Sequence, residues 1–337
     1  MDPKLVEQFS RRGFVQRFGT AMAGVSLSGI FPGDKVFAAP ASALADYTNP
    51  LKPRKAHFPT KAKACIYLYM YGGPSQMDLF DYKPELARHH GKTIDIEMRR
   101  RSIRKEKILG PVREFKRHGQ SGLWCSDAFP HTARHMDKMA VIKSLYMDSF
   151  AHGSANIQMT SGRVLQGHPA LGAWIAHGLG SANKNLPSFV VMVTKGKGGQ
   201  PLVSRLWGSG FLPSENQGLR FRSGANPVLH LQNPSGIGRD SRRLMLDRLR
   251  ELHELQLEGN PDAEIESRIA QYEMAFRMQA SVPEMADISD EPESVLKLYG
   301  PNVKKPGTYA RNCLEARRLA ERGVSFIQLF HIGWDQH

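Results

Sequence analysis

The chain of 337 residues has little cysteine, and none of it is spaced for metal binding. Its three cysteines, Cys65, Cys125 and Cys313, form no C-x-x-C motif, which excludes a disulfide framework and a thiolate zinc site. Outside the cytoplasm, two of the three cysteines could form a single disulfide. We expect instead that Cys65, within a strand, and Cys313, within a helix, are buried as small apolar residues.

Acidic residues are scarce relative to basic ones. The 32 Asp and Glu against 46 Lys and Arg give a formal net charge of +14, which points to anionic partners such as phosphate esters, sulfate esters or acidic polysaccharide. The densest basic run, Arg99 to Lys107, is expected to be a solvated loop. Basic residues are not interleaved with aromatic ones, and no RNA-binding signature is present, so nucleic acid is not expected as a partner.

Long hydrophobic runs are missing as well, and we expect no stable membrane span. The N-terminus instead resembles a twin-arginine export signal, because residues 10–15 read S-R-R-G-F-V around Arg11 and Arg12. An uncharged, modestly apolar stretch follows, and small residues come after it at 38–45, where a peptidase could cut. Residues 1–43 are therefore predicted to be recognised by the twin-arginine translocase and to direct the protein to the periplasm or the extracellular space.

Strand-like and helix-like segments alternate over the rest of the chain. Buried strands are predicted at 64–71, 139–146, 187–194 and 324–330, and helices at 130–138, 155–160, 169–178 and 309–322. This alternation favours an α/β fold with a largely parallel sheet flanked by helices. Two long amphipathic patterns, 240–258 and 263–280, predict a helical hairpin inserted in that domain or covering it.

The predicted domain extends from residue 63 to residue 337, after a linker at 44–62 that is rich in proline and lysine. The last predicted strand is followed by only a short polar segment, with no closing helix. We therefore expect the domain to be incomplete at its C-terminus, with further strands and ligands missing.

The segment that organises these predictions is 150–163, FAHGSANIQMTSGR. His152, Gly153 and Ser154 are expected where a strand ends and a helix begins, and free amide groups and the helix dipole favour an anion there. His152 or Ser154 could then touch a phosphate or sulfate. The simpler alternative is that Ser154 caps the helix and His152 is an ordinary loop residue.

The segment at 331–337, HIGWDQH, carries candidate metal ligands. His331, Asp335 and His337 supply the imidazole and carboxylate groups that bind zinc or another divalent ion. Asp78, after the first predicted strand, could add an oxygen ligand. The alternatives are a surface loop that contains two histidines and, for Asp78, a turn or a helix cap.

These polar groups all follow predicted strands, and a lysine- and glycine-rich loop at 195–199 follows another. That loop lacks the P-loop pattern and is expected to be flexible. Loops at the carboxyl ends of parallel strands gather on one edge of the sheet, where ligands bind. The sequence therefore predicts one site at this edge.

Five segments resemble a family of exported proteins, domain-of-unknown-function family 1501. The similar segments are GGPSQMDLFDYKP (72–84), GLWCSDAFPH (122–131), HGSANIQMTSGR (152–163), GHPALGAW (167–174) and GWDQH (333–337). Members of this family usually continue with a further strand and an E-F-G-R-T-like motif, which this chain lacks.

That resemblance implies a wider kinship with the alkaline phosphatase and sulfatase superfamily. Sulfatases place their nucleophile ten residues before the glycine of a T-G-R motif, and here the same count from Gly162 reaches His152. His152 cannot become formylglycine, so Ser154 is a possible substitute nucleophile. Gly72 and Gly73 stand where the superfamily has a metal-binding aspartate, and Asp78 would have to replace it.

Two functions follow from these features. The first is a metal-dependent hydrolase of phosphate or sulfate esters, such as a sulfated or phosphorylated polysaccharide, with a zinc, calcium or magnesium ion as its cofactor. Asp335, His337, Asp78 and His331 would supply ligands, and His152 or Ser154 would act on the ester. The alternative is an exported binding or structural protein that has lost the catalytic chemistry.

Overall fold

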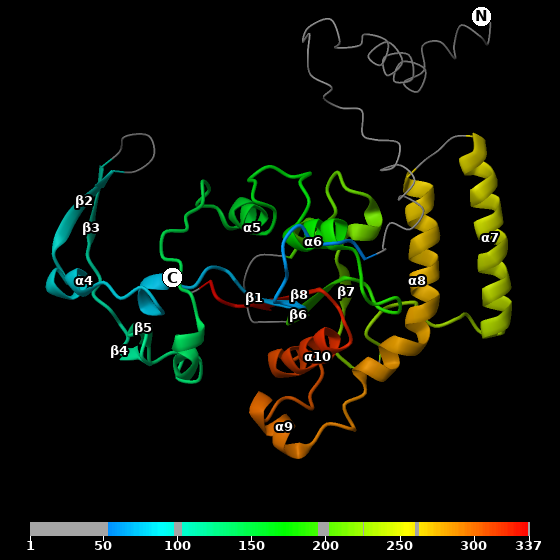
Figure 1. The fold of residues 1–337 in the computed structure, drawn as a ribbon. Helices are drawn as coiled ribbons and strands as arrows, with labels where there is room; N and C mark the ends of the chain where they lie inside the picture. Colours follow the sequence, from blue (N-terminus) through cyan, green and yellow to red (C-terminus); the bar gives the residue numbers. More distant parts are fainter. Residues whose placement is uncertain (1–52, 98–102, 195–201, 225, 260–262, 336–337) are drawn as a thin grey trace, which may run out of the picture. The chain divides into compact units, whose positions relative to one another are not determined.

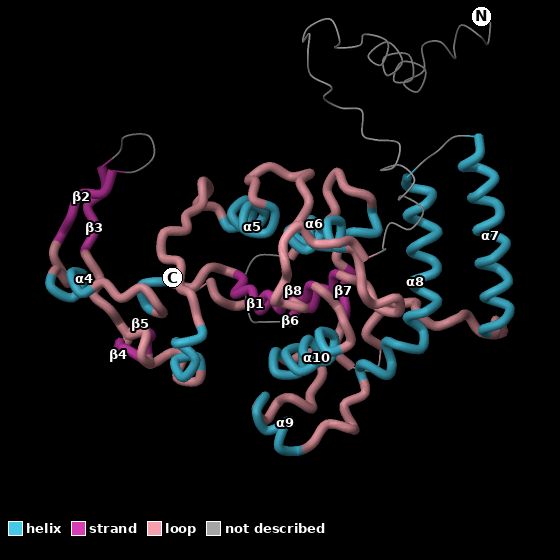
Figure 2. Tube along the Cα trace, in the orientation of Figure 1, coloured by secondary structure: helices cyan, strands magenta, loops and turns pink. Residues whose placement is uncertain are grey.

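The computed structural model describes residues 53–97, 103–194, 202–224, 226–259 and 263–335 (Figure 1). Its centre is a four-stranded sheet in the order β1-β8-β6-β7 (Figure 2). The strands are β1 (Cys65–Tyr71), β8 (Phe326–Ile332), β6 (Phe189–Thr194) and β7 (Leu219–Phe221), and every neighbouring pair is parallel. The predicted α/β fold with a parallel sheet flanked by helices is therefore confirmed.

One face of the sheet is covered by α10 (Tyr309–Glu321) and α8 (Ala263–Ala286). Alternate side chains of β8, Ile327 and Leu329, pack in one buried cluster with Leu319 of α10 and Met278 of α8. The Thr308 hydroxyl accepts a hydrogen bond from the Arg311 amide at 3.2 Å, which begins α10 with a side-chain cap. The alternate apolar side chains of the strand thus pack against the apolar face of the helix, as their spacing in the sequence predicts.

The other face carries α6 (Leu171–Leu179) and α5 (His152–Ser161). Two side chains of the opposite alternation in β8, Phe326 and Phe330, pack there with Phe189 and Tyr69. Phe326 and Phe189 meet edge to face with their ring centroids 5.4 Å apart. β8 is buried on both faces, as expected for an inner parallel strand.

The two long helices predicted near 240–280 are confirmed as α7 (Arg239–Gly259) and α8, which pack against each other. Arg243 of α7 contacts Glu273 of α8 at 2.5 Å and lies 5.1 Å from the Phe276 ring centroid. The last turns of α8 then turn to the sheet, where Val282 and Met285 are buried. α8 is therefore both the partner of α7 and part of the core.

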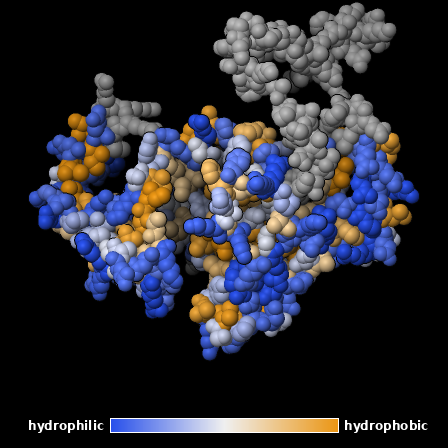
Figure 3. Space-filling model, in the orientation of Figure 1, coloured by the Kyte–Doolittle hydropathy of each residue, from blue (hydrophilic) through white to orange (hydrophobic). Residues whose placement is uncertain are grey.

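The polar region between β1 and α5 contains two antiparallel hairpins, β2 (Thr93–Glu97) with β3 (Ile103–Lys107) and β4 (Phe115–His118) with β5 (Leu123–Ser126). Short helices α4 (Pro84–Arg88) and α9 (Glu293–Tyr299) and a 3-10 helix at Thr132–Lys138 complete the main elements. Hydrophobic side chains are visible on the β2–β3 hairpin in Figure 3, where Ile94, Ile96 and Ile103 are exposed.

Four sequence predictions are wrong. The described part of the basic run, Ile103–Lys107, is strand β3 and not a loop, because it pairs with β2. Residues 139–146 form no strand, because Val141 packs beside the cluster of Cys125 and Met136 while Lys143 pairs with Asp81 at 3.5 Å. β1 is not a central strand, because among the described strands only β8 pairs with it. Cys65 is consequently exposed rather than buried.

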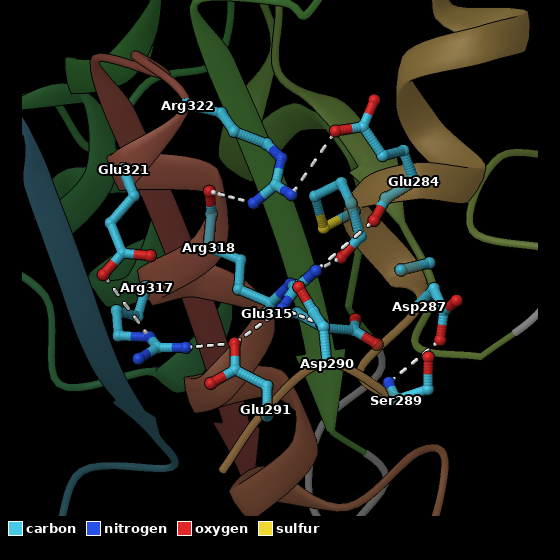
Figure 4. Close-up of polar contacts among 12 residues, drawn as sticks. Glu284, Asp287, Ser289, Asp290, Glu291, Glu315, Arg317, Arg318, Glu321 and Arg322 are labelled. Atoms are coloured by element: carbon cyan, nitrogen blue, oxygen red, sulfur yellow. Dashed lines mark hydrogen bonds and ion pairs between the residues drawn. The ribbon is translucent and has the colours of Figure 1, made fainter. Parts of the chain in front are cut away.

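A cluster of arginines fastens α10 to the segment that follows α8 (Figure 4). Arg318 Nη1 contacts Glu291 Oε1 at 2.6 Å and Asp290 Oδ1 at 2.8 Å, and its Nε donates to the Met285 carbonyl at 2.9 Å. Arg317 also pairs with Glu291. The Arg318 and Glu291 side chains are only 4% and 7% exposed, so this cluster is part of the interior.

Among the residues that the structure describes, the helices lack the combination of length and hydropathy that a membrane span requires.

Candidate functional site

The carboxyl ends of β1 and β8 lie side by side, because the strands are parallel and Tyr71 is paired with Ile332. Beyond the strands the two segments stay together, since the Trp334 amide donates to the Tyr71 carbonyl at 3.2 Å. A Cβ at Gly72 would lie 2.5 Å from the Asp335 amide nitrogen, and Gly72 has φ +121°. Only glycine fits there, and this contact of main chain with main chain fixes the position of Asp335.

α5 begins at His152, three residues earlier than predicted. Ala151 has an extended conformation, and Gly162 ends the helix with φ 76°. The helix is held to the sheet by the Tyr69 hydroxyl of β1, which donates to Asn156 Oδ1 at 2.5 Å in a buried position. This pair has no motif in the sequence and could not be predicted from it.

His152 and Asp335, distant in the sequence, meet at this edge. His152 Nε2 lies 3.2 Å from Asp335 Oδ1, and the two side chains are 29% and 36% exposed. A carboxylate at this distance holds the imidazole ring in one orientation and favours a proton on Nε2. The remaining nitrogen, Nδ1, then carries the lone pair that a base, a nucleophile or a metal ligand needs.

Ser154 lies in the first turn of α5 but is engaged with the loop before it. Its hydroxyl lies 2.5 Å from Ser149 Oγ and 3.2 Å from the Ala151 carbonyl oxygen. The Ala151 amide also donates to Ser149 Oγ at 3.2 Å. These contacts order the entry to the helix.

Gln158 strengthens the same loop through both ends of its amide group. Its Nε2 donates to Asp148 Oδ2 at 2.8 Å, and its Oε1 accepts from the Asp148 amide at 3.0 Å. The loop before His152 is therefore attached to α5 at two points, Ser154 and Gln158. The sequence predicted His152 and Ser154 as site residues, whereas no pattern in it indicated the supporting role of Gln158.

The other predicted metal ligands are placed apart from this pair or outside the described residues. His331 Nδ1 accepts from Trp334 Nε1 at 3.2 Å, its ring stacks on Tyr309 at 4.3 Å, and burial lowers its pKa. Asp78 closes a 3-10 turn at Gln76–Asp78. Within the described ranges, no three His, Cys, Asp or Glu residues come together in a way that could hold a metal ion.

Three further sequence predictions concern residues that the structure does not describe. These are His337 as a metal ligand, Arg11 and Arg12 as the export signal, and the loop at 195–199.

Aromatic side chains form a wall beside Asp335. The Trp334 ring stacks on Phe129 with centroids 6.1 Å apart, and Phe129 stacks on Phe80 at 5.4 Å. Phe80 and Phe129 belong to the segments 72–84 and 122–131, so two motifs that are distant in the sequence are in contact in the fold. They shape the surroundings of the carboxylate.

The first turn of α5 adds a positive end to this site. Helical hydrogen bonding begins with the Ala155 amide, which donates to the Ala151 carbonyl at 2.9 Å. The amides of the preceding turn have no acceptor within the helix, and the helix dipole adds to their positive potential. An imidazole paired with a carboxylate, beside such a helix end, could activate a water molecule against a bound anion.

Comparison with known proteins gives one result. The family described as "Protein of unknown function (DUF1501)" matches residues 62–337. No curated protein and no solved structure matches the chain.

Proposed function

The chain belongs to the DUF1501 family of proteins of unknown function, and we propose that the carboxyl edge of its sheet hydrolyses phosphate or sulfate esters. One observation carries this proposal, the 3.2 Å contact between His152 Nε2 and Asp335 Oδ1 at the end of two parallel strands. This edge is where α/β proteins bind their ligands. The wider kinship with alkaline phosphatases and sulfatases is part of the proposal and rests on the spacing between His152 and Gly162.

His152 acts as the general base in this proposal. Asp335 accepts a hydrogen bond from Nε2–H and so favours the tautomer in which Nδ1 is unprotonated. Nδ1 then takes a proton from water as the water oxygen attacks phosphorus or sulfur. The bond to the ester oxygen breaks, and that oxygen leaves with the electron pair and is then protonated. The first turn of α5 stabilises the charge of the ester group.

Binding of a divalent cofactor, which would be zinc, calcium or magnesium, is proposed separately from the hydrolytic steps. A catalytic zinc site typically has three protein ligands, and the described residues offer His152 and Asp335 as two adjacent donors. This set does not complete a metal site, so no step above depends on a metal. Replacing Asp335 and His337 with alanine should lower the divalent metal found by elemental analysis, and unchanged content would remove both from any such site.

The proposal is tested by hydrolysis of an aryl phosphate and an aryl sulfate. His152→Ala should lower the rate at least about 100-fold, as expected for loss of a general base. Asp335→Asn keeps the shape of the side chain and should cost about 10- to 100-fold. His135→Ala is the matched control, because His135 is an exposed histidine outside the site. Wild-type rates in both site variants would refute the assignment.

An exported binding or structural protein is the second candidate. The net charge of +14 favours it, because such a charge attracts sulfated or phosphorylated polysaccharide without any chemistry. It predicts that the wild-type protein hydrolyses neither aryl ester but binds the polysaccharide with an affinity that falls steeply as salt is added. Turnover of either ester, abolished by His152→Ala, would exclude it.

Export by the twin-arginine route is also proposed, and it rests on Arg11 and Arg12 in the sequence. Changing both to lysine keeps the charge and should leave the protein in the cytoplasm at its full-length mass. The measurement is the mass and location of the protein after cell fractionation. Normal processing of the double-lysine variant would show that another route is used.

A further inference from the structure

A cavity of about 320 Å³ lies away from the His152–Asp335 pair. Its lining includes residues of α8 and the first residues of β6 and β7, Phe189 and Leu219. His152 and Asp335 lie at the carboxyl edge of the same sheet. The cavity therefore belongs to a different part of the fold from the proposed hydrolytic site.

The inner wall of the cavity is apolar. Phe189 of β6 and Leu219 of β7 meet Met274 and Met278, which are one turn apart on the same face of α8. Phe189, Met274 and Met278 are buried. Methionine side chains are flexible and polarisable, so this wall can adapt to an aromatic or aliphatic group. A volume of this size is at the lower end of the range found for small-molecule sites.

The mouth of the cavity contains a carboxylate, Glu215. Ser267 Oγ donates to Glu215 Oε2, and Asn216 Nδ2 lies 3.4 Å from Oε1. Both donors are neutral, and among the described residues no Lys, Arg or His forms an ion pair with Glu215. The imidazole of His177 also lies near Glu215, but burial and Arg54 lower the pKa of His177 more than Glu215 raises it. A carboxylate that lines an apolar cavity and is hydrogen-bonded by neutral donors is complementary to a cation.

A second carboxyl group, Glu266, lies near Glu215. Burial and the nearby Glu215 carboxylate raise the pKa of Glu266. The buried oxygen Oε2 of Glu266 has no hydrogen-bond partner within the described part of the chain. Glu266 does not line the cavity, but it adds a second carboxyl group next to the one that does.

The loop that closes the cavity is fixed in place. Gln279 Nε2 of α8 donates to the Leu231 carbonyl at 2.8 Å and to Asn233 Oδ1 at 2.7 Å. Gln271 Nε2, two turns earlier on the helix, donates to Ser214 Oγ at 2.8 Å. α8 thus holds both rims of the cavity, and the cavity is formed before any ligand arrives, which lowers the entropy cost of binding.

We propose that this cavity binds a small amine, with its ammonium group at Glu215 and its aromatic or aliphatic body against Phe189, Met274 and Met278. Burial of the apolar part of the amine against this wall favours binding, and the carboxylate favours a positively charged ligand over a neutral one. An alcohol of the same shape lacks the charge, and a carboxylic acid of the same shape is repelled by Glu215. This assignment does not depend on the hydrolytic activity proposed above.

The probe for this proposal is 2-phenylethylamine, compared with 2-phenylethanol and 3-phenylpropionate by calorimetry on the full chain. The wild-type protein should bind the amine at least about tenfold more tightly than the alcohol, and should not bind the acid measurably. Glu215→Gln keeps an acceptor for Ser267 and should weaken amine binding at least tenfold. Glu264→Gln is the matched control, because Glu264 bonds Ser214 at 2.5 Å but does not line the cavity, and its affinity should stay within threefold.

A second pair of variants tests the location. Ala275 is exposed and lines the cavity, so Ala275→Phe should fill its mouth and abolish amine binding. Ala280 is exposed on the same helix but does not line it, and Ala280→Phe should bind as wild type does. Circular dichroism establishes that all variants are folded. Equal binding of amine and alcohol, absence of amine binding to the wild type, or wild-type affinity in Glu215→Gln or Ala275→Phe would each overturn the proposal.

Discussion

The arginines of α10 and the His152–Asp335 pair both join distant segments through charged groups, yet they lie in different surroundings. Arg318 is 4% exposed and contacts two carboxylates and two carbonyls, one of them the Met285 carbonyl at 2.9 Å. His152 and Asp335 are about one-third exposed. A buried charge with several partners cannot lose one without leaving the others unsatisfied, whereas an exposed pair can be rehydrated. The first arrangement therefore maintains the fold, and the second can serve chemistry.

The largest effect on stability is expected from Arg318→Ala. It leaves the buried Glu291 with one arginine fewer and removes the hydrogen bond to the Met285 carbonyl. The free energy of unfolding should fall by about 3–5 kcal/mol, as is typical when one partner of a buried ion pair is lost. Urea unfolding followed by circular dichroism measures it.

Arg322→Ala is the control on the same helix. Arg322 lies 3.8 Å from the exposed Glu284 and is itself partly exposed. Its loss should cost no more than about 1 kcal/mol, the upper end for surface pairs. Equal losses in the two variants would show that burial does not distinguish these arginines.

A smaller loss of stability is expected from Gly72→Ala, which disturbs a contact between main-chain atoms and not an ion pair. Gly72→Ala places a methyl group 2.5 Å from the Asp335 amide nitrogen at a φ of +121°, and should cost about 1–3 kcal/mol. Ester hydrolysis should fall with it, because Asp335 must move.

Gly73→Ala separates backbone strain from this clash. Gly73 also has a positive φ, +76°, but a Cβ there meets nothing within 4 Å. It should cost only about 1 kcal/mol and leave hydrolysis unchanged. A Gly73→Ala variant as inactive as Gly72→Ala would mean that the turn itself, and not the contact with Asp335, matters.

Acid should weaken the buried cluster. Burial opposes the ionised form of Glu291, but hydrogen bonds from Arg318 and Arg317 outweigh it and hold the pKa of Glu291 below its usual value of 4.5. Since the folded pKa is the lower one, the stabilisation is complete above the unfolded pKa and is lost as pH falls below about 4.5 through the folded value. Urea unfolding from pH 6 to pH 3 should show this loss in the wild type and a shallower slope in Arg318→Ala. Parallel slopes would assign the acid sensitivity to other carboxylates.

The smallest effect on stability is expected from His152→Ala. A partly exposed pair contributes no more than about 1 kcal/mol, so the unfolding curve should nearly coincide with that of the wild type. The same variant is expected to lose hydrolysis, and this separation of activity from stability is the mark of a functional pair. A large loss of stability would instead place His152 with the structural arginines.

The sequence was informative where local pattern and burial agree. The strand ending at Thr194, the strand within 324–332 and the helix from Tyr309 were all predicted close to their observed bounds, because their apolar periods match the faces they bury. The parallel order of the sheet followed from the alternation of strands and helices. The expected edge did bring His152 and Asp335 together.

What the sequence could not supply depends on contacts between distant segments. A run of apolar residues looks the same in an edge strand, a central strand and an irregular segment, so β1 and residues 139–146 were misjudged. The buried bond from Tyr69 to Asn156 has no local signature. Gly72 was read as a missing metal ligand, whereas its neighbours in space show that a side chain has no room there.

The contact between Gly72 and Asp335 also has a consequence for how this protein can vary. A side chain at position 72 would displace the main chain of Asp335, so substitutions at the two positions should be non-additive. A residue larger than glycine at position 72 would be tolerated only together with a displaced segment after β8, and that displacement would move the carboxylate away from His152. Related proteins that lack this glycine should therefore also lack the aspartate, so that the two positions vary together.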